Sequence, residues 1–506
     1  MRFMFAAFAL VLGASPSAAA TCESLGALSL PDAEITGAAT VAAGAFTPPN
    51  ARGGSPAASS AYASLPAFCR VTATLRPTSD SDIRIEVWLR SAGWNGKFQA
   101  VGNGGWAGTI PYGSLAGAVA AGYAAAATDT GHQGNTAAFA AGHPEKIVDM
   151  GYRAVHEMTV QAKALVAAYY GHPPALAVWN GCSQGGRQGI TEAVRYPADF
   201  DAVVAGAPAV NWMRLHAGRV ALNQAINASP AGAIPRETYS LIHAAALNVC
   251  DGLDGVKDGV IENPRACAFD PQVLECRAGE HGPCLTAAQV ESARAHYAPV
   301  RHPATGELVM PGLERGSELS WATLGGPQPI DNALEALKYV VFEDASYDWR
   351  RFNLAADLAR FDAADNGVLA SADPNLKPFF ERGGKLLIYH GWSDPQVVPG
   401  NTVEFFTRAV DAAGRDAVGA SIQLYMVPGM NHCQGGAGTD RFNPVAAIEA
   451  WIAGGKAPTR ITASRVENGA VVRTRPLCPY GEVARWDGTG STNDAASFAC
   501  VPAGDR

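Results

Sequence analysis

The residues with the clearest capacity for chemistry lie at positions 181–186, in the run Gly-Cys-Ser-Gln-Gly-Gly. This run fits the pattern Gly-x-Ser-x-Gly, in which a sharp strand-to-helix turn lifts a serine hydroxyl clear of a sheet edge. An apolar run over 176–179 precedes the pattern, and a helical stretch over 188–196 follows it. The context predicts Ser183 as the nucleophile of a hydrolase; a glycine-rich structural turn is the alternative interpretation.

A serine nucleophile needs a base, and the base needs an acid that orients it. In hydrolases with this turn, the chain order is serine, then aspartate or glutamate, then histidine, with the last two after later strands. Asp394 follows the apolar run 385–389, and His432 follows the apolar run 422–427. The order predicts Asp394 as the acid and His432 as the base.

Two cysteines lie next to the predicted catalytic residues. Cys182 precedes Ser183, and Cys433 follows His432. If Ser183 and His432 meet, their neighbours meet as well, and the two cysteines can form a disulfide that holds the base against the nucleophile. The alternative is that each cysteine pairs elsewhere.

Ester hydrolysis through a serine also needs two donors that face the carbonyl oxygen. One is expected to be the backbone N–H of Gln184, which follows the nucleophile. The second is expected from the glycine-rich turn at 102–105, unless that turn is only a tight connection.

A second motif lies at 251–260, where Asp251, Asp254 and Asp258 alternate with glycines. Carboxylates at such short spacings can surround one hard cation with oxygen ligands. The spacing differs from that of an EF-hand, and an acidic solvated loop is the alternative.

The elements that would position these residues alternate between strand and helix. Strands are expected over 83–90, 98–101, 123–127, 175–179, 202–205, 385–389 and 422–427, and helices over 148–170 and 446–453. This order predicts an α/β fold with a mostly parallel sheet covered on both faces. Between about 207 and 375 the alternation fades, and helical pieces, irregular loops and four cysteines take its place. We therefore predict an α/β-hydrolase fold with an inserted lid domain: catalytic residues 21–206 and 376–506, and a lid over 207–375 that contains the aspartate loop.

The composition and the charge pattern argue against a nucleic-acid-binding protein and against a membrane protein. The 506 residues are 48% hydrophobic and 17% charged, with a formal net charge of −8. The charges are dispersed without long like-sign runs, so no nucleic-acid partner is expected. No segment reaches about 20 consecutive apolar residues, so no membrane association is expected either.

The N-terminus has the pattern of a secretion signal. Arg2 supplies a positive charge, residues 4–13 form a short apolar stretch, and residues 18–20 are alanines. The pattern predicts a signal peptide over 1–20 and a secreted or periplasmic protein; a short buried N-terminal helix is the alternative. Ten cysteines suit disulfides in an exported protein, although the sequence alone does not choose their pairing.

Several marks together resemble the tannase and feruloyl esterase family, which includes bacterial mono(2-hydroxyethyl) terephthalate (MHET) hydrolase. They are Gly-Cys-Ser-x-Gly-Gly at 181–186, His-Gly-Trp-Ser-Asp ending at Asp394, Pro-Gly-Met-Asn-His-Cys at 428–433, and Arg-Thr-Arg-Pro-Leu-Cys-Pro-Tyr at 473–480. The resemblance covers nearly the whole chain after the predicted signal. It implies the Ser183, Asp394 and His432 triad and the Cys182–Cys433 bridge.

The resemblance also implies finer details of the site. It places the second oxyanion donor at Gly105, with Gly104 as the alternative, and a structural Ca²⁺ on Asp251, Asp254, Asp258 and the carbonyls of Val256 and Val260. The disulfides that it implies further are Cys22–Cys69, Cys250–Cys267, Cys276–Cys284 and Cys478–Cys500.

The expected function is hydrolysis of esters of aromatic (phenolic) acids, such as feruloyl or galloyl esters, through an acyl-enzyme. The expected partner is a small aromatic ester that could stack on Trp106, Trp212, Trp321, Tyr339, Phe342, Trp349 and Trp392. The alternative, which is the more common one for each of these residues, is a place in the core. The first alternative is hydrolysis of aromatic diacid monoesters like mono(2-hydroxyethyl) terephthalate. The insertion is shorter than in the MHET hydrolase, and Gln184 stands where that enzyme has an acid, so phenolic esters are favoured. A serine peptidase and a non-catalytic α/β-hydrolase-like binding protein are further alternatives, and the oligomeric state is not predicted.

Overall fold

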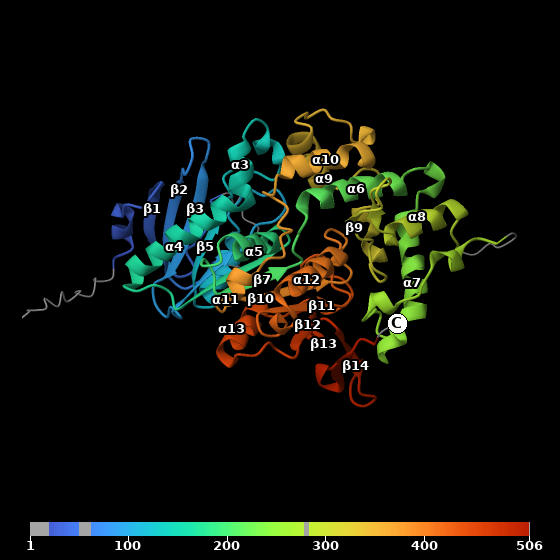
Figure 1. The fold of residues 1–506 in the computed structure, drawn as a ribbon. Helices are drawn as coiled ribbons and strands as arrows, with labels where there is room; N and C mark the ends of the chain where they lie inside the picture. The colour runs from blue at the N-terminus through green and yellow to red at the C-terminus, as the bar shows by residue number, and fades with distance from the viewer. Residues whose placement is uncertain (1–19, 50–61, 278–282, 505–506) are drawn as a thin grey trace, which may run out of the picture.

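Nine strands form one mixed sheet in the computed structural model, which describes residues 20–49, 62–277 and 283–504 (Figure 1). Their order across the sheet is β1-β2-β3-β5-β4-β6-β7-β10-β11, antiparallel from β1 to β5 and parallel from β5 to β11. The bounds are β1 Ala33–Val41, β2 Phe68–Leu75, β3 Ile83–Arg90, β4 Lys97–Val101, β5 Ala124–Thr128, β6 Leu176–Cys182, β7 Ala202–Gly206, β10 Lys385–Gly391 and β11 Ile422–Val427. The predicted α/β-hydrolase fold is confirmed.

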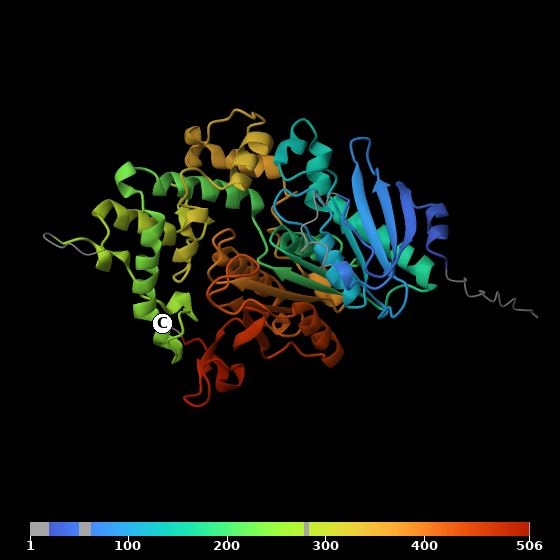
Figure 2. The same cartoon turned by 180° about the vertical axis from the view of Figure 1, so that it is seen from behind.

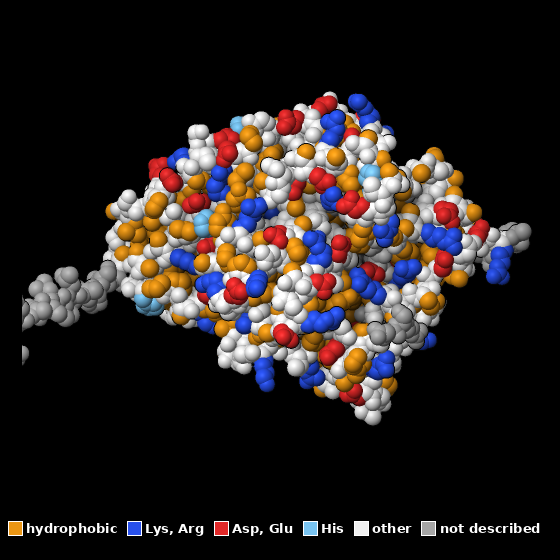
Figure 3. Space-filling view, viewed as in Figure 1, with side chains coloured by type: hydrophobic (Ala, Val, Ile, Leu, Met, Phe, Trp, Pro, Cys, Tyr) orange, Lys and Arg blue, Asp and Glu red, His pale blue; other side chains and the backbone are white. Residues whose placement is uncertain are grey.

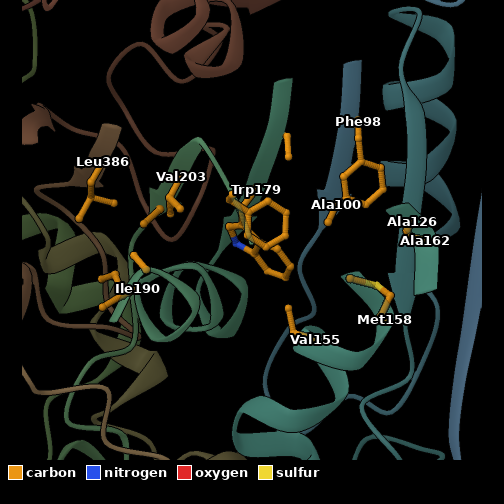
Figure 4. Close-up of a cluster of buried hydrophobic side chains, with 14 of the residues drawn as sticks. Phe98, Ala100, Ala126, Val155, Met158, Ala162, Trp179, Ile190, Val203 and Leu386 are labelled. Atoms are coloured by element: carbon orange, nitrogen blue, oxygen red, sulfur yellow. The ribbon is translucent and has the colours of Figure 1, made fainter. Parts of the chain in front are cut away.

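The parallel strands are short and apolar on both faces, because helices cover the sheet on both sides. In β10, Leu386 and Ile388 belong to one core and Leu387 and Tyr389 to the other. Helices α4 and α5 pack on the first face, in the core that Figure 4 shows around Trp179, and α2 and α13 pack on the second. Helices therefore pack on both faces of the sheet. The turns at the carboxyl ends of the parallel strands extend from this packed sheet.

The α-helices lie between and after the strands along the chain. They are α2 Tyr112–Ala120, α3 Pro144–Val148, α4 Ala154–Tyr170, α5 Gln184–Arg195, α6 Trp212–Ile226, α7 Tyr239–Cys250, α8 Ala287–Tyr297, α9 Asp331–Glu335, α10 Leu354–Asp365, α11 Lys377–Glu381, α12 Pro399–Ala413 and α13 Pro444–Gly454. The bounds of the predicted strands and of the predicted helix over 446–453 agree with the observed elements to within three residues. The predicted helix over 148–170 is interrupted, because a π-helical turn over Asp149–Arg153 separates α3 from α4.

Between β7 and β10 the chain leaves the sheet and forms a mainly helical segment, which we call the insertion (residues 207–375). It contains α6 to α10 and the short strands β8 (Val300–Arg301) and β9 (Leu308–Met310). It also supplies most of a further apolar core, which we call the core of the insertion and to which Trp106, Met150 and Val397 of the sheet domain contribute. Both ribbon views place it to one side of the sheet (Figures 1 and 2). The boundaries at 207 and 375 stay predictions.

The C-terminal residues form two hairpins, β12 (Ile461–Glu467) with β13 (Ala470–Leu477), and β14 (Glu482–Trp486) with β15 (Phe498–Pro502). The second hairpin packs against the aspartate loop of the insertion, where Val256 shares a small apolar cluster with Ala484 and Phe498. The two ends of the insertion are therefore not its only links to the rest of the chain.

All ten cysteines are paired, and none of the described cysteines is free. The disulfides are Cys22–Cys69, Cys182–Cys433, Cys250–Cys267, Cys276–Cys284 and Cys478–Cys500. These are the pairs that the family resemblance implied. The predicted signal peptide, apart from Ala20, lies outside the described residues.

Charged side chains of both signs are interspersed over the face shown in Figure 3, in keeping with the dispersed charges of the sequence. Within the described residues, no helix is both long and apolar enough to span a bilayer.

Candidate active site

Ser183 lies at the sharp turn between β6 and α5. Its backbone is at φ 65° and ψ −123°, a strained conformation for a residue with a side chain, and one typical of a nucleophile turn. The turn also brings α5 close to the neighbouring strand. A Cβ on Gly186 would lie 2.3 Å from the carbonyl oxygen of Gly206 at the end of β7, so only glycine fits at this position.

Arg187, one turn into α5, anchors the helix that begins at this turn. Its guanidinium is fully buried and donates to Gln184 Oε1 at 2.7 Å and to the carbonyl oxygens of Met150, Gly151 and Leu369. Burial lowers its pKa to about 10. Since Leu369 belongs to the end of the insertion, the guanidinium ties the nucleophile turn to the sheet domain and to the insertion at once.

Asp394 lies in the loop after β10 and is completely buried. Its Oδ1 accepts the backbone N–H groups of Gln396 at 2.8 Å and Val397 at 3.0 Å. Its Oδ2 lies 2.7 Å from Nδ1 of His432 and 3.0 Å from Nε2 of His390. Burial alone would raise the pKa of the Asp394 carboxyl, but the charge of His432 and the hydrogen bonds from both imidazoles outweigh it and hold that pKa well below its usual range.

The tautomers of both histidines follow from their neighbours. His390 Nε2 faces only acceptors, Asp394 Oδ2 and the carbonyl oxygen of Val397 at 2.9 Å, so it carries the proton. His390 Nδ1 then accepts the hydroxyl of Thr402 at 2.7 Å. His432 Nδ1 faces a carboxylate and also carries its proton, which leaves Nε2 as the unprotonated nitrogen of a neutral His432 imidazole.

The Cys182–Cys433 disulfide brings the serine turn and the histidine loop together. Its two Cα atoms are 6.1 Å apart, although the cysteines are separated by 251 positions in the chain. Because Ser183 and His432 each adjoin one of these cysteines, the structure gathers the three residues of the predicted triad at the carboxyl ends of β6, β10 and β11.

The two predicted oxyanion donors lie on turns that border Ser183. Gln184 is the first residue of α5, so its backbone N–H lies outside the helical hydrogen-bond ladder. Gly105 has φ 53°, and a Cβ there would lie 3.2 Å from Nδ2 of Asn332 in the insertion. The insertion thus covers this turn directly, and Asn332 also accepts, through its carbonyl oxygen, the indole N–H of Trp106 at 2.9 Å.

The aspartate loop follows α7 and is bordered by the C-terminal hairpins. Asp251 and Asp254 are buried, and Asp251 accepts the backbone N–H groups of Asp258 and Gly259. Asp258 is held by Arg475 and Arg473 of β13. Burial, with a smaller contribution from the charge of Asp258, raises the pKa of Asp254 to about 6.

The loop provides the right donors for a hard cation but does not gather them at one point. A cavity of about 10 Å³, with room for one small ion or water, is lined by Asp254, Asp258 and Glu262 and also by Arg473 and Arg475. Within the described residues, the only three ligand side chains whose donor atoms all lie within 4.8 Å of one another are His156, Glu192 and Asp199. A cation in the aspartate loop would therefore draw its carboxylates closer together.

The seven aromatic residues expected to stack on the substrate are mostly core residues. Trp106 and Trp212 meet edge to face at 5.3 Å inside the apolar core of the insertion. Trp321 belongs to the same core and stacks on His296, while Trp392 belongs to the core of the sheet. Tyr339, Phe342 and Trp349 pack on the core of the insertion from its edge. They do not form one stacking platform, because each apolar layer uses its aromatic residues to fill its own interior.

Three residues of the site were not singled out from the sequence: His390, Arg187 and Asn332. His390 stands four residues before Asp394, at the end of the predicted strand, and this spacing could have suggested a contact. Arg187 follows the nucleophile by four residues, but its partners come from positions 150, 151 and 369, which no local pattern relates. Asn332 reaches the site through the fold of the insertion alone.

Comparison with known proteins places this geometry in context. The family model described as tannase and feruloyl esterase matches residues 69–501. The chain is 38% identical to an uncharacterized esterase of Xanthomonas campestris, over 99% of this chain and 94% of that protein. It is 31% identical to the mono(2-hydroxyethyl) terephthalate hydrolase of Piscinibacter sakaiensis, over 89% of this chain and 87% of that protein. The crystal structure of feruloyl esterase B from Aspergillus oryzae superposes with a TM-score of 0.88 and 28% identity, over 95% of this chain and 99% of that one.

Proposed function

Because the chain belongs to the tannase and feruloyl esterase family and is a carboxylic ester hydrolase, we propose that it hydrolyses esters of aromatic (phenolic) acids through Ser183, His432 and Asp394. The observation that carries the proposal is the Asp394–His432 hydrogen bond at 2.7 Å, joined to the strained Ser183 turn by the Cys182–Cys433 disulfide.

In the first half of the reaction, His432 Nε2 removes the proton of the Ser183 hydroxyl, and the serine oxygen attacks the ester carbonyl. The backbone N–H groups of Gln184 and Gly105 stabilise the oxyanion that forms. His432 then donates its proton to the departing alcohol, and the aromatic acid stays bound to Ser183 as an acyl-enzyme. Asp394 holds the imidazole in the required tautomer and stabilises its charged form.

In the second half, a water molecule takes the place of the alcohol. His432 removes a proton from the water, whose oxygen attacks the acyl carbon, and the same two N–H groups stabilise the second oxyanion. Collapse of this intermediate returns the proton to Ser183 and releases the aromatic acid.

The preference for aromatic acids is drawn from the relatives. Feruloyl esterase B and mono(2-hydroxyethyl) terephthalate hydrolase are both named for esters of aromatic acids, and this chain matches each of them over most of its length. The terephthalate monoester is therefore the second candidate substrate.

We also propose that the aspartate loop holds a structural Ca²⁺ through Asp251, Asp254, Asp258 and the carbonyls of Val256 and Val260. Supporting this are the buried carboxylates of Asp251 and Asp254 and the left-handed turns at Gly255 and Gly259. Bound there, the cation would strengthen the contact between the insertion and the C-terminal hairpins.

Export is a further part of the proposal. The five disulfides are suited to an oxidising compartment outside the cytoplasm, and the N-terminal sequence has the pattern of a cleaved signal. N-terminal sequencing of protein recovered from the producing cells would test it, with a start close to residue 21 as the expected result.

A hydrolysis panel tests the proposed activity. The purified protein is assayed on methyl ferulate, methyl gallate, mono(2-hydroxyethyl) terephthalate and the amide analogue of methyl ferulate. We expect the highest kcat/KM on one of the two phenolic esters. A higher value on the terephthalate ester would favour the second candidate, a comparable rate on the amide would favour a peptidase, and no turnover of any ester would contradict the proposal.

A further inference from the structure

A cavity of about 420 Å³ opens beside the proposed base, His432. The loop after β11 contributes Asn431 and His432, and the loop after β10 contributes Gln396, two residues after Asp394. The insertion forms the opposite side, with Ser320 and Thr323 of the 3-10 turn η9 (Glu318–Thr323) and with Arg236 at the start of the turn η5 (Arg236–Thr238). The cavity is large enough for a group of several heavy atoms.

The position of the cavity identifies which half of an ester it would receive. His432 Nδ1 is bound to the buried Asp394, so Nε2 is the nitrogen that exchanges protons with the substrate. In acyl transfer through a serine, that nitrogen protonates the departing alcohol. The cavity borders His432, and from this contact we infer that it is the space next to the leaving oxygen, where the alcohol half would lie.

The charge of the cavity is positive. Arg236 is exposed, and its guanidinium makes no ion pair or hydrogen bond with any described residue. No described acidic side chain lines the cavity. Glu237, the next residue, faces a different cavity, and Glu318 is buried and bonded to His243 and Tyr297. An anionic group in this cavity would meet a guanidinium with no competing partner.

The other polar side chains in the cavity are uncharged. The hydroxyls of Ser320 and Thr323 and the amides of Gln396 and Asn431 form no side-chain hydrogen bonds with other described residues. They can donate to and accept from hydroxyl groups of a ligand. A purely apolar alcohol would leave these groups without the hydrogen bonds that water gives them.

We propose that this cavity binds the alcohol half of the substrate, and that the preferred alcohol is a hydroxylated carboxylic acid whose carboxylate pairs with Arg236. The inference rests on the proposed function, because it needs His432 as the base that protonates the leaving oxygen. Hydrolysis consumes one water and releases the aromatic acid and the hydroxy acid. Arg236 would thus make the enzyme prefer esters whose alcohol half carries a carboxylate.

Two matched feruloyl esters test the proposal. One carries 4-hydroxybutanoate as its alcohol half and the other carries 1,4-butanediol, so that they differ only in the terminal carboxylate or hydroxyl. We expect kcat/KM of the wild-type protein to be higher on the anionic ester, on the order of fivefold for a partly exposed ion pair. The difference should lie mainly in KM and should shrink in 0.5 M NaCl, since salt screens exposed charges.

Three variants of Arg236 and one control variant test whether Arg236 causes the preference for the anionic ester. In Arg236→Ala the ratio of kcat/KM between the two esters is expected to fall to about one, in Arg236→Lys to stay above one, and in Arg236→Glu to invert. The control is Arg350→Ala, which removes another exposed arginine of the insertion that pairs with Asp348 and does not line the cavity. It is expected to keep the wild-type ratio.

A second pair of substrates tests the orientation. Monomethyl terephthalate and methyl benzoate differ by a carboxylate on the acid half, and Arg236→Ala should leave their ratio as in the wild type. An equal rate of the wild type on both feruloyl esters, or a preference that survives in Arg236→Ala, would overturn the inference. A change in the terephthalate ratio instead of the feruloyl ratio would overturn it too. Failure to hydrolyse even the butanediol ester would instead contradict the proposed function.

Discussion

His390 Nε2 lies 3.0 Å from the same oxygen of Asp394 that lies 2.7 Å from His432 Nδ1. The carboxylate is therefore oriented by a second imidazole, which is itself fixed by the hydroxyl of Thr402. The other oxygen of Asp394 accepts the backbone N–H groups of Gln396 and Val397. Together with the two imidazoles, these groups make four donors to a completely buried carboxylate. The position of the proposed base depends on this arrangement, since His432 takes its orientation from Asp394.

Replacing Asp394 by asparagine should lower kcat by a factor on the order of 10³–10⁴, with a smaller change in KM. The asparagine side chain keeps the shape of the carboxylate, but a side-chain NH₂ toward His432 favours the wrong imidazole tautomer. Steady-state kinetics on methyl ferulate measure the effect, and thermal melting checks that the variant is folded. Near-normal turnover would mean that another carboxylate orients His432.

The Cys182–Cys433 bridge should matter more for turnover than for stability. It holds the loops that carry Ser183 and His432, and a misplacement of about 1 Å between catalytic groups can cost on the order of a hundredfold in rate. The double variant Cys182→Ala, Cys433→Ala is compared with Cys478→Ala, Cys500→Ala, which removes the bridge of the C-terminal segment. We expect the Cys182→Ala, Cys433→Ala variant to show a much larger fall in kcat than the control when each fall is compared with the fall in Tm of the same variant. Equal losses in both variants would make the bridge a structural link only.

Removal of calcium should lower Tm more than it lowers initial activity. A ligand that binds only the folded state stabilises it by mass action, and the proposed ligands lie between the insertion and the C-terminal hairpins. Differential scanning fluorimetry with a chelator, and then with excess Ca²⁺, measures the shift. Protein that contains no calcium by elemental analysis and shows no shift on adding it would contradict the proposed site.

Asp129 should give the protein a pH-dependent stability. Burial raises the pKa of this carboxyl to about 7 in the folded protein, from a usual value near 4. Between these pH values the folded protein holds a proton that the unfolded chain releases, so the contribution of Asp129 to stability decreases as pH rises. Asp129→Asn does not titrate, and its Tm relative to wild type should be more favourable at pH 8 than at pH 5. The exposed control Asp411→Asn should show no such change; a Tm difference for Asp129→Asn that is equal at both pH values would contradict the prediction.

The sequence was most informative where a local pattern decides the structure. The strands next to the site are apolar runs that end at glycines, and the order of Ser183, Asp394 and His432 along the chain follows from the order of the strands. It was least informative for contacts made between distant segments. Asn332 lies over Gly105, and Arg187 reaches residue 369, because the insertion folds back onto the sheet domain.

The aromatic residues illustrate the same limit. An aromatic side chain in a sequence fits a core, which is the more common place for it, or a binding surface, and only packing distinguishes the two. In the structure Trp106, Trp212 and Trp321 are buried in the core of the insertion. Likewise, the π-helical turn at Asp149–Arg153 begins with a buried carboxylate that accepts hydrogen bonds from Arg153 and Ser81, contacts that helical periodicity does not reveal.

The central claim, that Ser183 is the nucleophile, is tested most directly by covalent labelling. The protein is treated with diisopropyl fluorophosphate, and peptide mapping by mass spectrometry then locates the adduct. We expect one adduct per chain, on Ser183, formed in proportion to the loss of esterase activity, and no adduct and no activity in folded Ser183→Ala. An adduct on another residue with Ser183 unmodified, or substantial turnover by Ser183→Ala, would contradict the mechanism.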